Sequence, residues 1–259
     1  MIAVVRCYNG TRAPGGGGMQ VLRAALLLTC TLGAGIVSQP QPLELDHISI
    51  VVPPGAALDA AALEAAGFRF LKSTPTFQRG QGTASRSIGF ENVYIELIWV
   101  TDRPELLAAD PELAPRLQHA DPRVVRVGLA LRRHAASDSI PFPTREYSAE
   151  WTGPLKLHFA KTGNVEPYVS VLPPELSWPT AAAGLTAELQ HPNGARRVTQ
   201  VTWVHHKRGA STPAVAYLRD ARVVRFGLAA DYFIEIELDD GQVGKRVDLR
   251  PQLPLVFRR

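Results

Sequence analysis

Two segments of the chain alternate between apolar and polar positions as half-buried strands do. Residues 43–52 carry His47 and residues 92–100 carry Glu96, each on the face opposite to an apolar row. These rows are Ile48, Ile50 and Val52 in the first segment and Val93, Ile95, Leu97 and Trp99 in the second. If both rows pack beneath a helix, His47 and Glu96 point together into the open side of one sheet.

The elements between these two segments predict one βαβββ module over residues 43–100. The alanine-rich stretch at 56–66 predicts a helix, and Gly67 is expected to end it. Residues 68–71 and 85–90 predict the second and third strands, and the fourth strand follows.

The same order of elements recurs near the C-terminus and predicts a second module over residues 191–259. When the two modules are aligned by facing, Gln200 takes the position of His47, and Glu235 takes that of Glu96. The four side chains are then expected to face one another.

Residues 101–190 are, in this interpretation, an insertion between the modules. The segment is rich in proline, and residues 104–118 are expected to be irregular or helical. Strands are expected at 124–131, 155–160 and 167–172, with no clear helix among them. A second arrangement stays open, in which strands of the insertion supply the other half of the cup. In that case Gly128 replaces a ligand, and the argument for a metal is largely lost.

Residues 1–42 are predicted to be a leader outside the fold. From Met19 onwards the sequence resembles a secretory signal, with Arg23 at its charged end and an apolar core at 24–37. The apolar run is too short for a stable transmembrane helix, so we expect no membrane insertion after the signal is removed. The expected location is the periplasm or the outside of the cell.

The cysteines add little to the chemistry of the fold. Cys7 and Cys30 are the only two, and both precede the predicted domain of residues 43–259. Lipid attachment at Cys30 is disfavoured, because Thr29 is atypical before such a site. The domain therefore has no thiolate nucleophile and no cysteine-based zinc site.

Charge and motifs exclude several classes of function. Three of the 28 basic residues and none of the 24 acidic ones lie in residues 1–38, which leaves a nearly neutral body and no electrostatic case for nucleic acid. The glycine-punctuated loop at 80–82 lacks the lysine and the helix of a phosphate-binding loop. No serine lies in the pattern of a hydrolase elbow.

Five segments together resemble glyoxalase-like domain proteins of the vicinal oxygen chelate superfamily, which includes glyoxalase I, extradiol dioxygenases and bleomycin-resistance proteins. They are Leu45-Asp46-His47-Ile48, residues 80–86, Tyr94-Ile95-Glu96-Leu97, His191-Pro192-Asn193-Gly194 and residues 248–255. The resemblance implies an α+β fold of paired βαβββ modules. Their curled mixed sheet would form a cup-shaped cavity, with helices on its outer face.

The resemblance also implies one divalent metal ion held by four side chains. Carried over to this sequence, the ligands are His47, Glu96, Gln200 and Glu235, a mixed nitrogen and oxygen set that suits zinc, nickel, manganese, cobalt or iron. Glu235 or Glu96 would act as the catalytic base. The substrate would contact Arg86, Phe90, Tyr94 and Phe233.

Several functions remain open on the sequence alone. The first is an exported, metal-dependent isomerase, lyase or dioxygenase that acts on a small oxygenated substrate. The second is a metal-free protein of the bleomycin-resistance type that binds or sequesters a small molecule, and the third is a scaffold whose cup is filled by its own side chains. His47 could be purely structural, and Glu96 could pair with Arg86. The chain could be a monomer or a homodimer.

Overall fold

A computed structural model describes residues 43–117, 124–205 and 211–259. The predicted leader of residues 1–42, with its signal segment and Cys30, lies outside the described residues. Among the described residues, no helix is long and apolar enough to cross a membrane.

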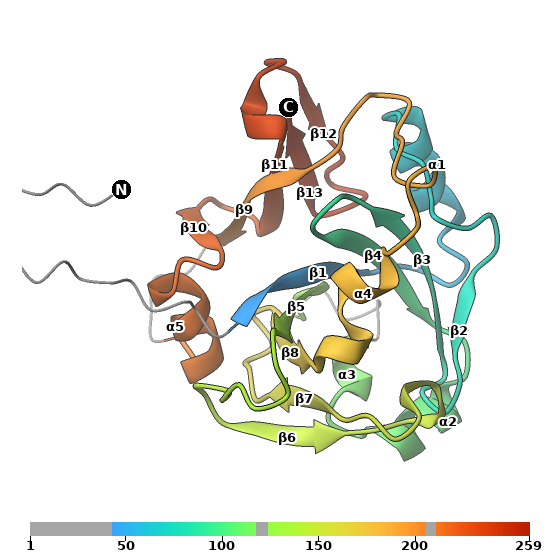
Figure 1. The fold of residues 1–259 in the computed structure, drawn as a ribbon, viewed down its shortest axis with the longest axis vertical. Helices are drawn as coiled ribbons and strands as arrows, with labels where there is room; N and C mark the ends of the chain where they lie inside the picture. Colours follow the sequence, from blue (N-terminus) through green and yellow to red (C-terminus); the bar gives the residue numbers. More distant parts are fainter. Residues whose placement is uncertain (1–42, 118–123, 206–210) are drawn as a thin grey trace, which may run out of the picture. The chain divides into compact units, whose positions relative to one another are not determined.

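The first strand, β1 (Leu43–Val51), lies near the centre of an eight-stranded mixed sheet with the order β2-β3-β4-β1-β5-β8-β7-β6 (Figure 1). The other strands are β2 (Thr76–Gln78), β3 (Thr83–Gly89), β4 (Tyr94–Val100), β5 (Val127–Arg133), β6 (Thr144–Tyr147), β7 (Leu157–Ala160) and β8 (Tyr168–Leu172). β1 is parallel to β4 and antiparallel to β5, and β5 is parallel to β8. The predicted α+β fold with a curled mixed sheet is confirmed.

The second half of this sheet comes from residues 127–172, which the preferred alignment assigned to an insertion. β5 pairs with β1 along most of its length, so the halves β1–β4 and β5–β8 repeat one pairing pattern around the β1–β5 pair. The alternative arrangement, in which the segment 101–190 completes the cup, is the one observed.

Residues 191–259 instead form a separate five-stranded sheet with the order β10-β9-β11-β13-β12. Its strands are β9 (Val198–His205), β10 (Arg225–Leu228), β11 (Phe233–Leu238), β12 (Arg246–Asp248) and β13 (Leu255–Arg258). The predicted elements are present, but β9 runs antiparallel to β11, whereas β1 runs parallel to β4. The proposed second module of residues 191–259 is therefore not a copy of the first.

Helices occupy little of the chain. They are α1 (Ala57–Ala65), α2 (Arg103–Ala109), α3 (Ala114–Leu117), α4 (Trp178–Ala181) and α5 (Pro213–Asp220), with single turns η1 (Glu150–Thr152), η2 (Pro174–Leu176) and η3 (Asp239–Gly241). Gly67 follows α1 with a φ of +83°, a left-handed conformation that favours glycine. A β-carbon at this position would also lie 2.8 Å from the β-carbon of Asn193. Both the backbone conformation and the lack of space therefore favour glycine at the end of the helix.

One apolar cluster joins the two sheets. It contains both predicted apolar rows, from Ile48 to Val52 and from Val93 to Trp99, together with Leu63 of α1 and Trp203 of β9. Complete burial of an aliphatic side chain is worth about 1.5–3 kcal/mol, so these rows fix which face of β1 and β4 is closed. The opposite face of these strands is left for His47 and Glu96.

Candidate ligand-binding site

The open face of the eight-stranded sheet lines a cavity of about 570 Å³. Its wall is largely apolar, with leucine side chains and six aromatic ones, Phe77, Tyr94, Trp151, Phe159, Tyr168 and Trp178. Concave, mostly apolar cavities of about 300–1,000 Å³ are typical of small-molecule sites. The dimensions fit a ligand of drug-like size.

His47 and Glu96 form a polar group in this apolar wall. The parallel register of β1 and β4 sets Ser49 opposite Glu96 and His47 opposite Tyr94. The Ser49 hydroxyl donates a 3.0 Å hydrogen bond to Glu96 Oε2, and His47 Nε2 lies 4.0 Å from the same oxygen. The predicted meeting of His47 and Glu96 in one cup is therefore observed.

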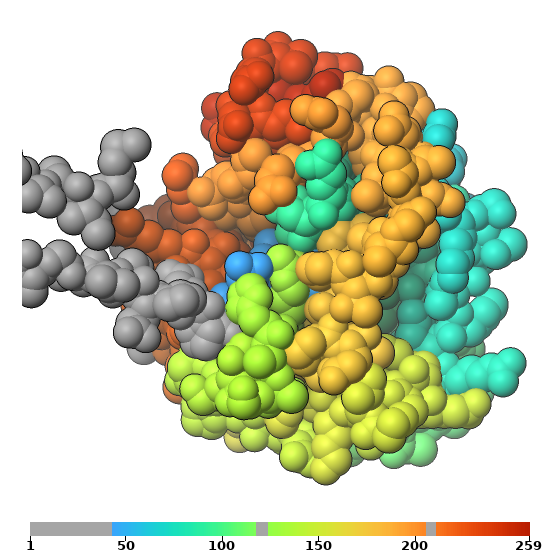
Figure 2. Space-filling model, viewed as in Figure 1, coloured from blue at the N-terminus to red at the C-terminus, as the bar shows by residue number. Residues whose placement is uncertain are grey.

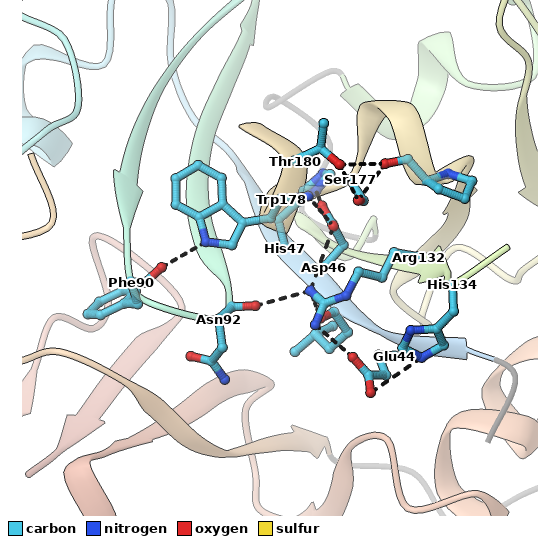
Figure 3. A network of polar contacts seen from close by, with 12 residues as sticks. Glu44, Asp46, His47, Phe90, Asn92, Arg132, His134, Ser177, Trp178 and Thr180 are labelled. Atoms are coloured by element: carbon cyan, nitrogen blue, oxygen red, sulfur yellow. Dashed lines mark hydrogen bonds and ion pairs between the residues drawn. The ribbon is translucent and has the colours of Figure 1, made fainter. Parts of the chain in front are cut away.

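Asp46 fixes the orientation of the His47 ring (Figure 3). The pairing of β1 with β5 shifts by one residue between Leu45 and His47, and this bulge lets two successive side chains meet. His47 Nδ1 lies 2.9 Å from Asp46 Oδ1. Because a carboxylate only accepts, Nδ1 carries the proton, and Nε2 faces Glu96.

Arg132 of β5 places a positive charge beside Asp46. Its guanidinium donates to Glu44 at 2.7 Å and to the carbonyl of Leu45 at 3.0 Å, and it lies 3.8 Å from Asp46 Oδ2. The Asp46 carboxylate is fully buried, so its charge is balanced mainly by hydrogen bonds and by this cation.

Two tyrosines occupy equivalent positions in the two halves of the sheet. Tyr94 pairs with His47 across β1 and β4, and Tyr168 pairs with Gly128 across β5 and β8. Burial raises the pKa of both phenols above the ordinary value, and the charge of Glu96 adds to the effect. Both phenols therefore stay protonated at neutral pH.

The residues present do not fit the predicted four-ligand metal site. His47 and Glu96 are close enough, since two ligands each about 2.1 Å from an ion lie at most about 4.2 Å apart. Matching Tyr168 to Tyr94 makes Gly128 the equivalent of His47 and Ser170 the equivalent of Glu96. The second half of the cup thus offers a hydroxyl but no imidazole or carboxylate at these positions.

The structure places the other two predicted ligands elsewhere. Gln200 and Glu235 belong to the five-stranded sheet, where the Gln200 amide donates to the carbonyl of Val201 and Glu235 pairs with Arg258 at 3.4 Å. Within the described ranges, no three histidine, cysteine, aspartate or glutamate side chains gather as a metal site would need. Gln200 and Glu235 were assigned through the wrong strand equivalence.

Of the predicted substrate contacts, Tyr94 is in the cavity wall, stacked on His47 with ring centroids 4.3 Å apart. Phe90 is fully buried in the core cluster instead. Phe233 lies in the other sheet, under the guanidinium of Arg250.

Arg86 borders the cavity, but its guanidinium is engaged on the side of α1. It pairs with Glu64 at 3.3 Å and lies over the Phe70 ring at 3.9 Å. The alternative in which Arg86 pairs with Glu96 is therefore not observed.

The segment that links the two sheets runs across the site. Figure 2 shows it as a light-orange band on this face of the molecule. It contributes Leu176, Trp178, Ala181 and Leu185 to the cavity wall. The backbone N–H of Trp178 donates to Asp46 Oδ2 at 2.6 Å, and its indole donates to the carbonyl of Phe90 at 2.7 Å.

Sequence reasoning missed several residues of this site. Asp46 was visible beside His47, but strict alternation puts neighbours on opposite faces, and no local signal marks the bulge. Tyr168 and Ser170 could have been found by testing residues 124–172 as the second module. Trp178 offered no signal at all, because its role depends on a contact with Asp46, 132 residues away.

Comparison with known proteins shows the fold alone. No protein-family model matches the chain, and no curated protein matches it. Among solved structures, it is similar to a hypothetical protein from Staphylococcus aureus, with a TM-score of 0.50 and 12% sequence identity, over 83% of this chain and 99% of that one.

Proposed function

We propose that the protein binds a small, largely apolar molecule in the cavity of the eight-stranded sheet, without a resident metal ion. The observation that carries the proposal is a 570 Å³ cavity whose wall is largely aromatic and which contains the close pair of His47 and Glu96. This is the metal-free function that the resemblance to bleomycin-resistance proteins offers.

The donor set supports this choice over a metal-dependent isomerase, lyase or dioxygenase. Of the described residues that line the cavity, only His47 and Glu96 supply strong ligand atoms, and both already have protein partners in Asp46 and Ser49. The aromatic wall supplies the apolar contact area that gives small ligands most of their affinity, while the polar pair fixes their orientation.

Binding is tested by blocking the cavity from a residue that tolerates change. Ala181 ends α4, is exposed and borders the cavity, so Ala181→Trp should fill the site without disturbing the core. Ala183 is exposed and outside the lining, which makes Ala183→Trp the matched control. The neutral fluorescent probe N-phenyl-1-naphthylamine should bind to the wild type and to Ala183→Trp with similar affinity. It should bind at least about tenfold more weakly to Ala181→Trp. The proposal would be contradicted if the probe bound all three proteins equally, or if it did not bind the wild type.

Metal analysis separates the two functions. The protein is purified without chelators, and its zinc, nickel, manganese, cobalt and iron contents are measured beside those of His47→Ala and Glu96→Gln. We expect well below one ion per chain in all three. About one ion per chain in the wild type, lost in both variants, would instead support the metal-dependent function.

We also propose that the protein is exported. The support is the charged end at Arg23 followed by the apolar core at 24–37. N-terminal sequencing of the protein from its own cells should find a start near residues 38–42. An intact leader on protein from the cytosol would contradict this part of the proposal.

A further inference from the structure

We infer that the ligand of this cavity carries a cationic amino group that binds beside Glu96. The inference deepens the proposed function by naming the chemical class of the ligand, an organic amine with an apolar body. It rests on the charges around Glu96 and on the aromatic rings that surround them.

Glu96 is a nearly buried carboxylate with little positive charge near it. Its side chain is 13% exposed and accepts a hydrogen bond from the neutral Ser49 hydroxyl. Among the residues that the structure describes, the only chargeable nitrogen within 4.0 Å of it belongs to His47. A buried carboxylate without a cation is costly, so the site favours a ligand that supplies one.

The excess of negative charge holds for either protonation state of His47. Asp46 and Glu96 flank the imidazole, at 2.9 Å and 4.0 Å. A single positive charge on His47 offsets one of these carboxylates, not both. Arg132 offsets the charge of Asp46 only in part, because its guanidinium lies 3.8 Å from Asp46 and is shared with Glu44 at 2.7 Å.

The rings around this pair suit an ammonium group. The Tyr94 ring stacks on His47, and its centroid lies 5.0 Å from that of the Trp178 ring. Tyr94 and Trp178 both belong to the cavity wall. The faces of indole and phenol rings attract cations, most strongly where water is excluded. A carboxylate beside aromatic faces therefore selects an amine over a neutral alcohol of the same shape.

Two cationic side chains also border the cavity, and they define the opposite outcome. Arg86 is engaged with Glu64, whereas Lys72 is exposed to solvent and could attract an anionic ligand. If Lys72 rather than Glu96 decided the selection, a carboxylate ligand would bind best.

The test compares three ligands that share a phenyl ring on a four-methylene chain, 4-phenylbutylamine, 4-phenylbutan-1-ol and 5-phenylpentanoate, at about pH 7.5. Each displaces N-phenyl-1-naphthylamine from the wild-type protein, and the displacement gives its affinity. We expect the amine to bind about tenfold more tightly than the alcohol, and the carboxylate to bind most weakly. An alcohol as tight as the amine, or a carboxylate tighter than both, overturns the inference.

The variant Glu96→Gln tests whether Glu96 causes the preference for the amine. Glu235→Gln, the same substitution in the five-stranded sheet, is the matched control. The preference for the amine should vanish in Glu96→Gln and persist in Glu235→Gln. A preference that persists in folded Glu96→Gln overturns the inference, and if that variant does not fold, the wild-type ranking decides. The proposed function fails separately, if the probe does not bind or if Ala181→Trp leaves its binding unchanged.

Discussion

The backbone N–H of Trp178 donates a 2.6 Å hydrogen bond to Asp46 Oδ2, across 132 residues of sequence. The other oxygen of the same carboxylate accepts a 2.9 Å hydrogen bond from His47 Nδ1. One fully buried side chain thus orients the imidazole and holds the segment that crosses the cavity. The polar pair and the wall of the site are coupled through a single residue.

Asp46→Asn should reverse the hydrogen bonding of His47. An amide can accept from Trp178 only by turning its NH₂ group towards Nδ1, which would move the imidazole proton to Nε2. Nitrogen NMR of the imidazole should report this change of tautomer. The free energy of unfolding should fall by about 1–3 kcal/mol in urea denaturation, because charge-assisted bonds are lost. Asp240→Asn, in an exposed turn, is the control and should stay within about 0.5 kcal/mol of wild type. An unchanged tautomer would refute the assigned role of Asp46.

Gly128→Ala should destabilise the second half of the sheet. A β-carbon at this position would lie 2.1 Å from Cζ of Tyr168, so the ring must move. Overpacking of this kind costs about 1–3 kcal/mol. At Gly163 the nearest atom would be 3.4 Å away, and Gly163→Ala is the matched control in urea denaturation. In the double variant Gly128→Ala with Tyr168→Ala, the losses should be less than additive. Strict additivity would show that the tyrosine is not the obstacle.

Local pattern was enough to predict the faces of β1 and β4. The row containing Ile48 and the row containing Leu97 are in the core, and His47 and Glu96 face the cavity. These positions follow from a period of two and from burial, which depend only on neighbouring residues.

Strand pairing could not be predicted in the same way. Residues 127–133 and 198–205 are both apolar strands of similar length, and alternation does not tell which of them pairs with β1. The second is followed by a helix, α5, and therefore matches the βαβββ order of the first module. The real partner has no helix between β5 and β6, so the equivalence that led to Gln200 and Glu235 was wrong.

His191 should make the protein less stable in acid. Its Nδ1 accepts from the backbone N–H of Arg69 at 3.1 Å, and its Nε2 lies 2.9 Å from the carbonyl of Gly89, so the buried ring is held neutral. Burial lowers the pKa of His191 below the ordinary 6.5. The unfolded chain then binds this proton more readily, and stability is lost as the pH falls below about 6.5.

The measurement is the free energy of unfolding between about pH 7 and pH 5. His191→Gln keeps one donor and one acceptor but cannot titrate, so it should flatten the slope by up to about 1.4 kcal/mol per pH unit. His134→Gln is the control, since the side chain of His134 is 52% exposed. Equal slopes in wild type and His191→Gln would contradict the prediction.

Tyr147 should produce the opposite dependence in alkali. Its phenol donates to Gln81 Oε1 at 2.9 Å, and burial raises the pKa of Tyr147 to about 12. The folded chain keeps this proton after the unfolded chain loses it near pH 10, so the contribution of Tyr147 to stability is complete below pH 10 and lost as the pH rises towards 12.

Absorbance at 295 nm should show that Tyr94, Tyr147 and Tyr168 ionise only as the protein unfolds, whereas urea-unfolded protein titrates near pH 10. Tyr147→Phe should reduce the loss of unfolding free energy by up to about 1.4 kcal/mol per pH unit in that range. Complete ionisation of all tyrosines near pH 10 in still-folded protein would show that these phenols are not held as described.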